Sequence, residues 1–423
     1  MKRKTFMKRK LLAINLILTI LLCFTACGRV ISGAVSDADD GLVRDGLQSL
    51  DVAQFMGNGI NLCNCLEGYA REDLGTDSPI EDYETFLGQE VVTQDMIDGM
   101  KAAGFDTLRI PVAFTNTMDL ENGDYTIRED YLIRLKEIVD YARNVDMYVI
   151  IAEDTDGNWW RWLSSEDPAF RIAARNLYKA IWKQVAEYFK GYSDYILFEG
   201  GDKELGYRLN GEDKSGILSE EECYSVASEM NQLFVDTVRG TGGNNTNRFL
   251  IVPGYDSSIT SVEDMKFVMP DDIVDYRLLI SVHYYYPVDY TQNEYLNKWG
   301  TIYDYGVMNE YLAKMSNYGL NGYGVIISEY GVATEKGGHL RQGTLDYYRN
   351  FINNCDLYQY VPILWDNGQV YSRSLCEITN QELEYFFMTK SSVSREGMFA
   401  DDIANQAYNE ITKDFATAPK ELK

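Results

Sequence analysis

Eight short apolar runs, each followed by a longer segment of helical pattern, constrain the fold of this 423-residue chain more than any other feature. Each run is nearly continuous and rich in Ile, Val, Leu or Tyr, which is typical of parallel strands buried on both faces. We place the strands at 56–62, 107–112, 147–152, 195–198, 248–252, 278–284, 323–328 and 361–365. We place the helices at 93–103, 128–145, 168–190, 219–239, 299–318, 342–353 and 400–415. Eight strands alternating with helices predict an α/β fold, a single-domain (β/α)8 or TIM barrel.

The N-terminus has the composition of a targeting signal. Six basic residues precede an apolar run of 12 residues at 11–22, which is too short to span a bilayer comfortably. Small residues just before Cys27 predict a bacterial lipoprotein signal, with Cys27 as the lipidated residue. Phe24 departs from the usual leucine, and a plain signal peptide or an uncleaved anchor is the alternative. We expect a signal peptide over 1–26, a flexible tether over 27–45 and the barrel over 46–418, lipid-anchored at the outer face of the cell membrane or secreted.

The charge and the scarcity of histidine exclude several classes of function. The net charge is −26, and removing residues 1–26 with their six positive charges leaves −32. Such a charge argues against nucleic acid and anionic membrane surfaces as partners, so we expect membrane contact only through the lipid on Cys27. Only two histidines are present, so we expect no metal and no cofactor. A bridge between Cys63 and Cys65 would be strained, and we expect small buried thiols.

Polar and aromatic residues follow the predicted strands, where a barrel of this type carries its chemistry. They are Asn61, Asn64 and Glu67; Arg109; Asp154, Thr155, Asp156, Asn158 and Trp159; Glu199, Asp202, Lys203 and Glu204; His283 and Tyr285; Glu329; and Trp365, Asp366 and Asn367. A buried Arg or a strand-end Trp is also a common structural feature, so the inference depends on the gathering at one rim. The set predicts a carbohydrate site in which Trp365 stacks on a sugar. Glu329 would be a nucleophile kept ionised by Arg109 and Tyr285.

Seven segments extend this interpretation to a family. They are GNGINL at 57–62, GFDTLRIPV at 104–112, DGNWW at 156–160, NRFLIVPG at 247–254, VHYY at 282–285, IISEYG at 326–331 and WDNG at 365–368. In order and spacing they resemble glycoside hydrolase family 5, the cellulase-like retaining enzymes, over roughly residues 45–415. The resemblance implies that Glu329 is the nucleophile and Arg109 its charge partner. It also implies that His283 and Tyr285 line the cleft and that Trp365 is the sugar platform. We expect Asn64, Asp154, Trp159 and Asp202 to complete the substrate-binding residues.

The chain departs from the family pattern at several site positions. Where the family has Asn-Glu after strand four, with Glu as acid/base, this chain has Asp202 and Lys203. Where the family usually has two histidines after strand three, it has Asp154 and Thr155, and Cys63 and Cys65 replace a Gly and a Thr after strand one. An ammonium with an ordinary pKa near 10.4 is a poor proton donor at neutral pH. At contact distance from Glu329, it would also pair with the nucleophile.

One expected function and three alternatives follow from these departures. We expect a cell-surface protein that acts on or binds β-linked polysaccharide or oligosaccharide, with O-glycosyl hydrolysis impaired by Lys203. One alternative is an active endo-β-glycanase in which Glu204, brought into the cleft by a one-residue bulge, or another acid such as Glu199 or Asp202 replaces the lost carboxyl. Another is a non-catalytic glycan-binding lipoprotein, and a third is a partner-binding protein on a former enzyme barrel. We expect a monomer.

Overall fold

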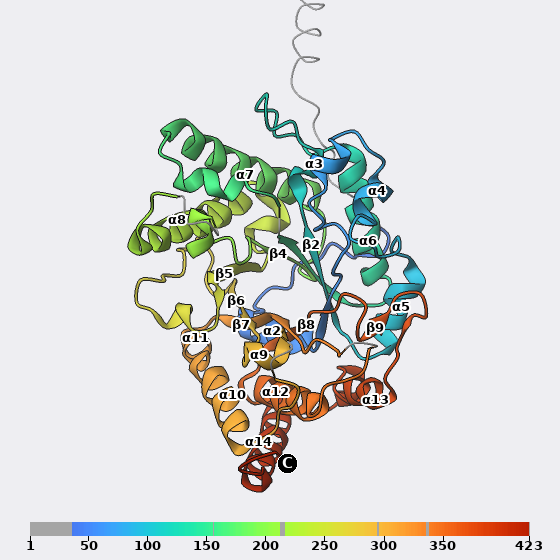
Figure 1. Ribbon diagram of the computed structural model, residues 1–423. Helices are drawn as coiled ribbons and strands as arrows, with labels where there is room; N and C mark the ends of the chain where they lie inside the picture. The colour runs from blue at the N-terminus through green and yellow to red at the C-terminus, as the bar shows by residue number, and fades with distance from the viewer. Residues whose placement is uncertain (1–35, 155, 212–215, 294–295, 336–337, 423) are drawn as a thin grey trace, which may run out of the picture.

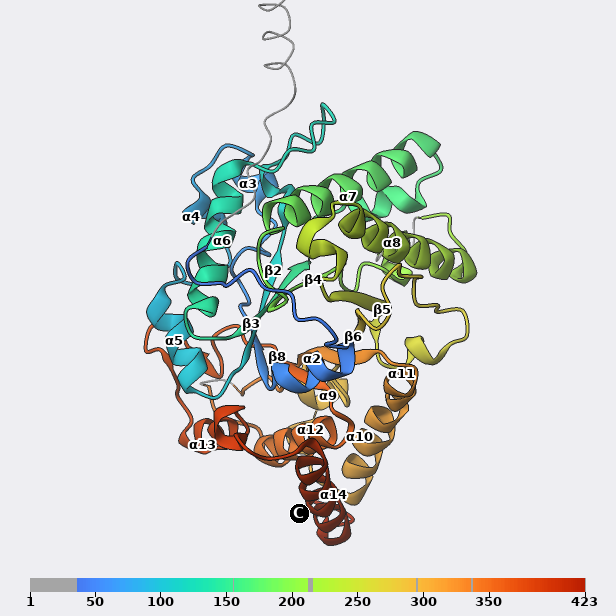
Figure 2. The ribbon, with the colours of Figure 1, turned by 180° about the vertical axis from the view of Figure 1, so that it is seen from behind.

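Eight parallel strands form a closed barrel in which each strand pairs with the next along the chain and β8 pairs with β1. The computed structural model describes residues 36–422, except 155, 212–215, 294–295 and 336–337. The strands are β1 (Gly59–Asn61), β2 (Thr107–Val112), β3 (Tyr148–Glu153), β4 (Ile196–Glu199), β5 (Leu250–Ser258), β6 (Leu278–Tyr284), β7 (Gly324–Tyr330) and β8 (Val361–Leu364). Helices surround these strands on all sides (Figures 1 and 2). The predicted (β/α)8 barrel is therefore confirmed.

The long helices of the barrel begin at residues that satisfy free backbone N–H groups. Thr93 caps α5, Asp167 caps α7 just before Pro168, and Ser219 opens α8 in a capping box with Glu222. The main helices are α2 (Ser49–Met56), α5 (Gln94–Ala102), α6 (Glu129–Arg143), α7 (Pro168–Tyr188), α8 (Glu220–Gly240), α10 (Ile302–Lys314), α12 (Thr344–Tyr358), α13 (Gln381–Thr389) and α14 (Ala400–Thr417). Short helices are α3 (Arg71–Leu74), α4 (Ile80–Glu84), α9 (Val288–Thr291) and α11 (Ser316–Leu320).

Two predicted elements begin later than expected because other structure replaces their first residues. The first strand was expected to begin at Met56, but Met56 ends α2, whose buried residues Val52, Ala53 and Met56 recur with helical spacing. The helix expected over 299–318 begins only at Ile302, because Thr301 forms a capping box with Asp304, and it divides into α10 and α11. Trp299 instead packs into the core at 2% exposure.

The barrel interior is layered along its axis. Helix α2 closes the N-terminal end, where its apolar face packs with the inward side chains Ile150, Leu197, Phe249, Ile251, Leu279, Ile326, Val361 and Ile363. Side chains alternate along a strand, so residues two positions further along also point inward. On β4 this alternation takes Leu197 into the apolar layer and Glu199 into a polar layer above it. The sequence therefore places buried charge directly beneath the C-terminal rim.

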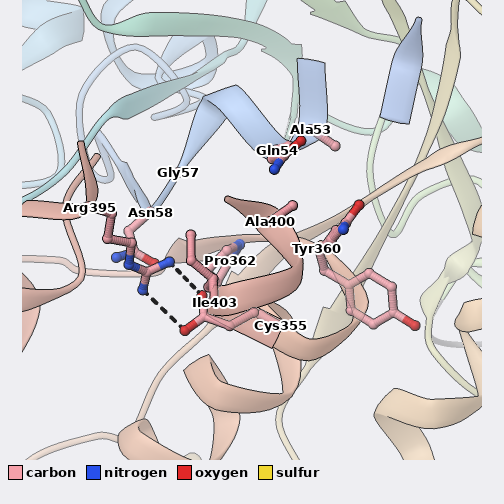
Figure 3. A pocket seen from close by; sticks show the side chains of 12 residues that line it. Ala53, Gln54, Gly57, Asn58, Cys355, Tyr360, Pro362, Arg395, Ala400 and Ile403 are labelled. Atoms are coloured by element: carbon pink, nitrogen blue, oxygen red, sulfur yellow. Dashed lines mark hydrogen bonds and ion pairs between the residues drawn. The ribbon is translucent and has the colours of Figure 1, made fainter. Parts of the chain in front are cut away.

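A small cavity lies at the opposite, N-terminal end of the barrel (Figure 3). It holds about 50 Å³ between α2, the residues before β1 and β8, and α14. Arg395 points along its wall and pairs with Asp356 at 2.8 Å. The cavity is remote from the C-terminal ends of the strands, where barrels of this type carry their active sites.

Residues 36–45 are attached to the barrel, which corrects the tether predicted over 27–45 for this part. Asp39 pairs with Arg143 at 3.0 Å, and Arg44 pairs with Asp194 at 2.9 Å. The signal peptide, Cys27 and Thr155 lie outside the described residues. Within the described part, no helix has the length and apolar character needed to cross a membrane. Cys63 and Cys65 are buried free thiols, as expected.

Candidate active site

Arg109 on β2 is the centre of the polar layer beneath the rim. Its guanidinium is fully buried and contacts Glu199 at 2.5 Å, Asp202 at 3.0 Å and Asp154 at 3.5 Å. Burial alone would lower its pKa, but these carboxylates raise the pKa of Arg109 well above its usual value. A fourth group, Asn61, accepts from the same guanidinium at 3.0 Å. Arg109 therefore neutralises three buried acids and fixes the floor of the site.

Glu329 ends β7 with three partners around its carboxylate. The Tyr285 hydroxyl donates to Oε2 at 3.1 Å, His283 Nδ1 lies 3.4 Å from Oε2, and Arg109 Nη1 lies 4.0 Å from Oε1. Burial raises the pKa of Glu329, while the positive charges of His283 and Lys203 oppose that rise. The sequence predicted this arrangement of Arg109, His283 and Tyr285 about Glu329, and the structure brings all four together.

His283 is held as a cation between two acids. Its Nε2 lies 3.1 Å from Asp202 Oδ1, and its Nδ1 faces Glu329. Burial lowers the pKa of His283, but Asp202 and Glu329 outweigh it and raise the pKa to about 9. Asp202, His283 and Glu329 offer ligand atoms within 4.8 Å of one another. Arg109 lies against the same two acids, 3.0 Å from Asp202 and 4.0 Å from Glu329, so the three groups already form ion pairs with one another and with Arg109.

Lys203 occupies the position that the resemblance assigns to the acid/base. Its Nζ lies 3.5 Å from Asp154 Oδ1, and its side chain is 29% exposed. Burial lowers its pKa, but Asp154 and then Asp202 raise the pKa of Lys203 well above its usual value. The ion pair of Lys203 is made with Asp154, and between Lys203 and Glu329, both described, there is none within 4.0 Å. The Lys203 ammonium therefore does not pair with the nucleophile Glu329. It pairs with Asp154, which is another residue at which this site departs from the family pattern.

The three acids considered as substitutes have different surroundings. Glu199 is held under the cleft by Arg109 at 2.5 Å. Burial raises the pKa of Asp202, but His283 and Lys203 hold that pKa well below its usual value, so Asp202 is no proton donor. Burial raises the pKa of Glu204 to about 7, against the opposing charge of Lys203. However, Glu204 is not among the described residues that line the cleft.

An open cleft of about 630 Å³ lies over these groups at the C-terminal ends of the strands. Its walls include Lys203, Asp256, His283, Tyr285, Tyr286, Gln292, Glu329, Trp365, Asn367 and Gln369. Asp366 shapes the loop after β8, because its carboxylate accepts from the N–H groups of Gln369, Val370 and Tyr371 at 2.8 Å each. Trp365 also lies on this wall.

Of the predicted binding residues, Arg109, Asp154 and Asp202 lie in the buried polar layer beneath the cleft, and two others, Trp159 and Asn64, lie in neither the described cleft lining nor that layer. Trp159 is 2% exposed and stacks on Trp160 at 4.0 Å, in the core rather than on the cleft wall. Asn64 adopts a left-handed φ of 55° and donates its backbone N–H to Glu67, and it is absent from the described cleft lining. Sequence reasoning missed Asp256 and Arg208, which do line the cleft. The polar run Asp256–Ser258 directly after an apolar strand was the available signal.

Comparisons with known proteins agree with this geometry. The family model of cellulase, glycosyl hydrolase family 5, matches residues 72–370. The chain is 31% identical over 342 residues to a xyloglucan-specific endo-β-1,4-glucanase of Bacteroides ovatus, covering 76% of this chain and 65% of that protein, so it spans less than two thirds of this relative. It is 31% identical over 355 residues to endoglucanase A of Paenibacillus barcinonensis, covering 76% of this chain and 84% of that protein.

Solved structures give the same assignment. The Bacteroides ovatus family 5 xyloglucanase in complex with a XXXG heptasaccharide superposes with a TM-score of 0.72 at 29% identity, over 85% of this chain and 80% of that one. A broad-specificity endoglucanase from Ruminococcus champanellensis with bound cellotriose gives a TM-score of 0.72 at 28% identity, over 82% and 99% of the two chains. Because the family model covers residues 72–370 and both the sequence and the barrel match these enzymes, the chain belongs to glycoside hydrolase family 5.

Proposed function

We propose that the protein binds a β-1,4-linked glucan chain in the 630 Å³ cleft and attacks it through Glu329, at a rate limited by a poor acid/base half of the site. The observation that supports this most directly is the ion pair between Lys203 and Asp154 at the acid/base position, beside a Glu329 that keeps Tyr285, His283 and Arg109. The nucleophile Glu329 thus keeps the partners it needs to form the glycosyl–enzyme bond, whereas the residue expected to transfer protons is replaced by Lys203.

The chemistry of retention explains the expected impairment. A retaining glycosidase needs a second carboxyl about 5–5.5 Å from the nucleophile, first to protonate the leaving oxygen and then to activate water. The ammonium of Lys203 is stabilised by Asp154, so it gives up its proton even less readily than a free lysine. Loss of a positioned acid/base costs about 10²–10⁴ in rate. Hydrolysis of an unactivated glycan is therefore expected to be slow, whereas binding is retained.

The substrate class is supported by the relatives. The Bacteroides ovatus protein is a xyloglucan-specific endo-β-1,4-glucanase, and the Ruminococcus champanellensis structure holds cellotriose. An open cleft with Trp365 on its wall suits an extended chain of equatorial β-linked sugars, whose flat apolar faces stack on aromatic rings. We therefore propose a glucan backbone, with or without side branches, as the ligand.

The test compares reducing-sugar release from soluble β-glucans by the wild type, Lys203→Glu and Lys203→Gln. The Gln variant is the matched control, because it removes the ammonium without supplying an acid. We expect slow release by the wild type, a gain of about 10²-fold or more in Lys203→Glu and no comparable gain in Lys203→Gln. Release by the wild type at an ordinary glycosidase kcat, about 10 s⁻¹, would contradict the proposed impairment.

A binding measurement separates ligand recognition from turnover. Calorimetric titration of Glu329→Gln with cellohexaose and with a xyloglucan oligosaccharide removes any hydrolysis by the nucleophile. We expect binding of at least one of them. No binding of either, together with inactivity of Lys203→Glu, would refute a β-glucan as the ligand. Binding with no turnover in any variant would support the purely glycan-binding alternative instead.

We also propose that Cys27 carries the lipid that holds the protein at the outer face of the cell membrane. The basic start, the short apolar run and the small residues before Cys27 support this. Cys27→Ser is expected to move the protein from the membrane fraction to the soluble exported fraction. Unchanged membrane association of Cys27→Ser would refute lipidation at this residue.

A further inference from the structure

Asp256 is a carboxyl of the cleft that the family pattern leaves without a role. It lies near the C-terminal end of β5, where the register between β5 and β6 shifts between Pro253 and Ser258. Such a bulge turns side chains away from the directions of a regular strand, and bulges are frequent next to active sites. Asp256 and Ser257 both adopt left-handed φ values, 58° and 45°. Two consecutive non-glycine residues in this region are unfavourable, so the surrounding structure must fix them there.

The loop that carries Lys203 provides this support. The Asp256 backbone N–H donates to the Leu205 carbonyl at 2.8 Å. A Cβ on Gly206 would lie 2.6 Å from Asp256 Cβ, so only glycine allows the loop after β4 to approach so closely. The Ser257 hydroxyl donates to Asp202 Oδ1 at 3.2 Å. Asp256 is therefore held directly beside the acid/base loop, at the end of the neighbouring strand.

The Asp256 carboxyl has the position and the pKa that a proton-transferring group in the cleft needs. It lines the same cleft as Glu329 and Lys203, and its Oδ1 is buried with no hydrogen-bond partner in the described part of the chain. Burial raises the pKa of Asp256 to about 7. The positive charges of Arg208, His283 and Lys203 oppose this rise, and the negative charge of Asp202 adds to it. A carboxyl that is half protonated near neutral pH is the form that a general acid/base requires.

We propose that Asp256 is the acid/base of this site and supplies the proton that Lys203 cannot. The proposal rests on the proposed function, with Glu329 as nucleophile. In the first step a Glu329 oxygen bonds to the anomeric carbon, the carbon–oxygen bond to the leaving sugar breaks, and the Asp256 proton passes to that oxygen. In the second step the Asp256 carboxylate takes a proton from water, the water oxygen bonds to the anomeric carbon, and the ester to Glu329 breaks. Both carboxyls return to their starting states.

Arg208 completes the surroundings of this carboxyl. It lines the cleft and follows Lys203 on the same loop, and of the charges that oppose the raised pKa of Asp256 its own is the largest. The groups facing Asp256 are thus Lys203 and Arg208 from the loop after β4, Asp202 beneath them and His283 from β6. This balance of charge leaves Asp256 able to take either protonation state during the cycle.

The test uses two substrates that differ in their need for an acid. Cellotetraose has a poor leaving group and needs protonation, whereas 2,4-dinitrophenyl β-cellobioside loses dinitrophenolate without it. The variant is Asp256→Asn, because asparagine tolerates a left-handed φ. We expect cellotetraose cleavage to fall by about 10–100-fold, because Asp256 supplies only part of the 10²–10⁴ that a fully positioned acid/base contributes and so leaves the wild type slower than Lys203→Glu. Release of dinitrophenolate in the first turnover should stay within about threefold, since that step uses Glu329 alone. Azide, which needs no general base, should restore turnover of this substrate and yield a β-glycosyl azide.

Glu204→Gln tests the rival acid, because Glu204 is the neighbouring carboxyl, lies off the described cleft wall and also has a pKa of about 7. We expect its loss of cellotetraose cleavage to be much smaller than that of Asp256→Asn, and an equal or larger loss overturns the proposal. Cellotetraose cleavage that is unchanged in Asp256→Asn overturns the proposal, as does a wild type that releases dinitrophenolate but never cleaves cellotetraose. In both cases the proposed function still stands. A wild type that neither binds cellotetraose nor releases dinitrophenolate would instead remove the proposed function itself.

Discussion

Replacing Asp154 in the Lys203→Glu background should shift the pH dependence of the restored enzyme. Lys203 Nζ lies 3.5 Å from Asp154 Oδ1, a separation at which opposite charges attract by about 5 kcal/mol at an effective dielectric constant of about 20. An introduced glutamate is shorter, so its carboxylate would lie about 5–6 Å from Asp154. At that distance the two like charges repel by roughly 3 kcal/mol. At 1.36 kcal/mol per pH unit, the pKa of the introduced acid rises by about 2.

The sign of the effect follows from the role of the introduced group. A general acid works in its protonated form, so activity falls as pH rises through its pKa. The alkaline limb of kcat/KM for cellotetraose should therefore lie about 2 pH units higher in Lys203→Glu than in Lys203→Glu with Asp154→Asn. Asp154→Asn alone is the control, and it should not raise the rate. Alkaline limbs that coincide within about half a pH unit would refute the reasoning that these two positions face each other.

Three further predictions concern the groups around Glu329 and the cleft wall. Tyr285→Phe removes a hydrogen bond to a charged group worth about 1.5–3 kcal/mol, so first-turnover release of dinitrophenolate should slow about 10–100-fold; an unchanged rate would contradict this. Because the pKa of His283 is raised to about 9, its stabilising contribution, on the order of 3 kcal/mol, is full below about pH 6.5 and lost as pH rises through 9. Urea unfolding should accordingly show a stability gap between the wild type and His283→Gln that closes over this interval, and a constant gap would disprove the linkage. Trp365→Ala should weaken cellohexaose binding to Glu329→Gln by about tenfold, whereas Trp159→Phe, changed in the core, should alter it less than twofold; equal effects would contradict the placement of the two rings.

The barrel could be predicted because parallel strands leave a strong sequence signal. Strands β2 and β6 have the predicted bounds, 107–112 and 278–284, since both are continuous apolar runs buried throughout their lengths or nearly so. The N-terminal boundary of β1 was wrong, because Met56 reads equally well as the start of an apolar strand or the end of a helix. Only the tertiary contact of α2 with the apolar layer of the barrel decides between them.

The site could be predicted where alternation along a strand or a motif gives a residue's position. Alternation along β2 turns Arg109 inward. Glu329 lies three positions after the inward-facing Ile326, where the register of β7 shifts, so its motif and not the alternation predicted its place. Asp256 was missed because the predicted fifth strand ended at 252, whereas β5 continues through a bulge to Ser258. Trp159 was misplaced because a Trp-Trp pair after a strand gives no indication of which ring faces solvent. Here both are buried and stack on each other.

Lys203 and Asp154, two residues that depart from the family pattern, form an ion pair and so compensate each other's charge. With a histidine in place of Asp154, Lys203 would join Arg109 and His283 as a third cation among Glu199, Asp202 and Glu329, and it would be drawn toward the nucleophile. Asp154 instead holds the ammonium at 3.5 Å and itself lies 3.5 Å from Arg109, so it is compensated on both sides. Asp154 is buried while the Lys203 side chain is 29% exposed, so losing the lysine would leave a buried carboxylate with one cation fewer, and either replacement alone would be unfavourable. This pairing leaves the partners of Glu329 in place. We therefore expect proton transfer to the leaving group, and not attack by Glu329, to be the step that is impaired.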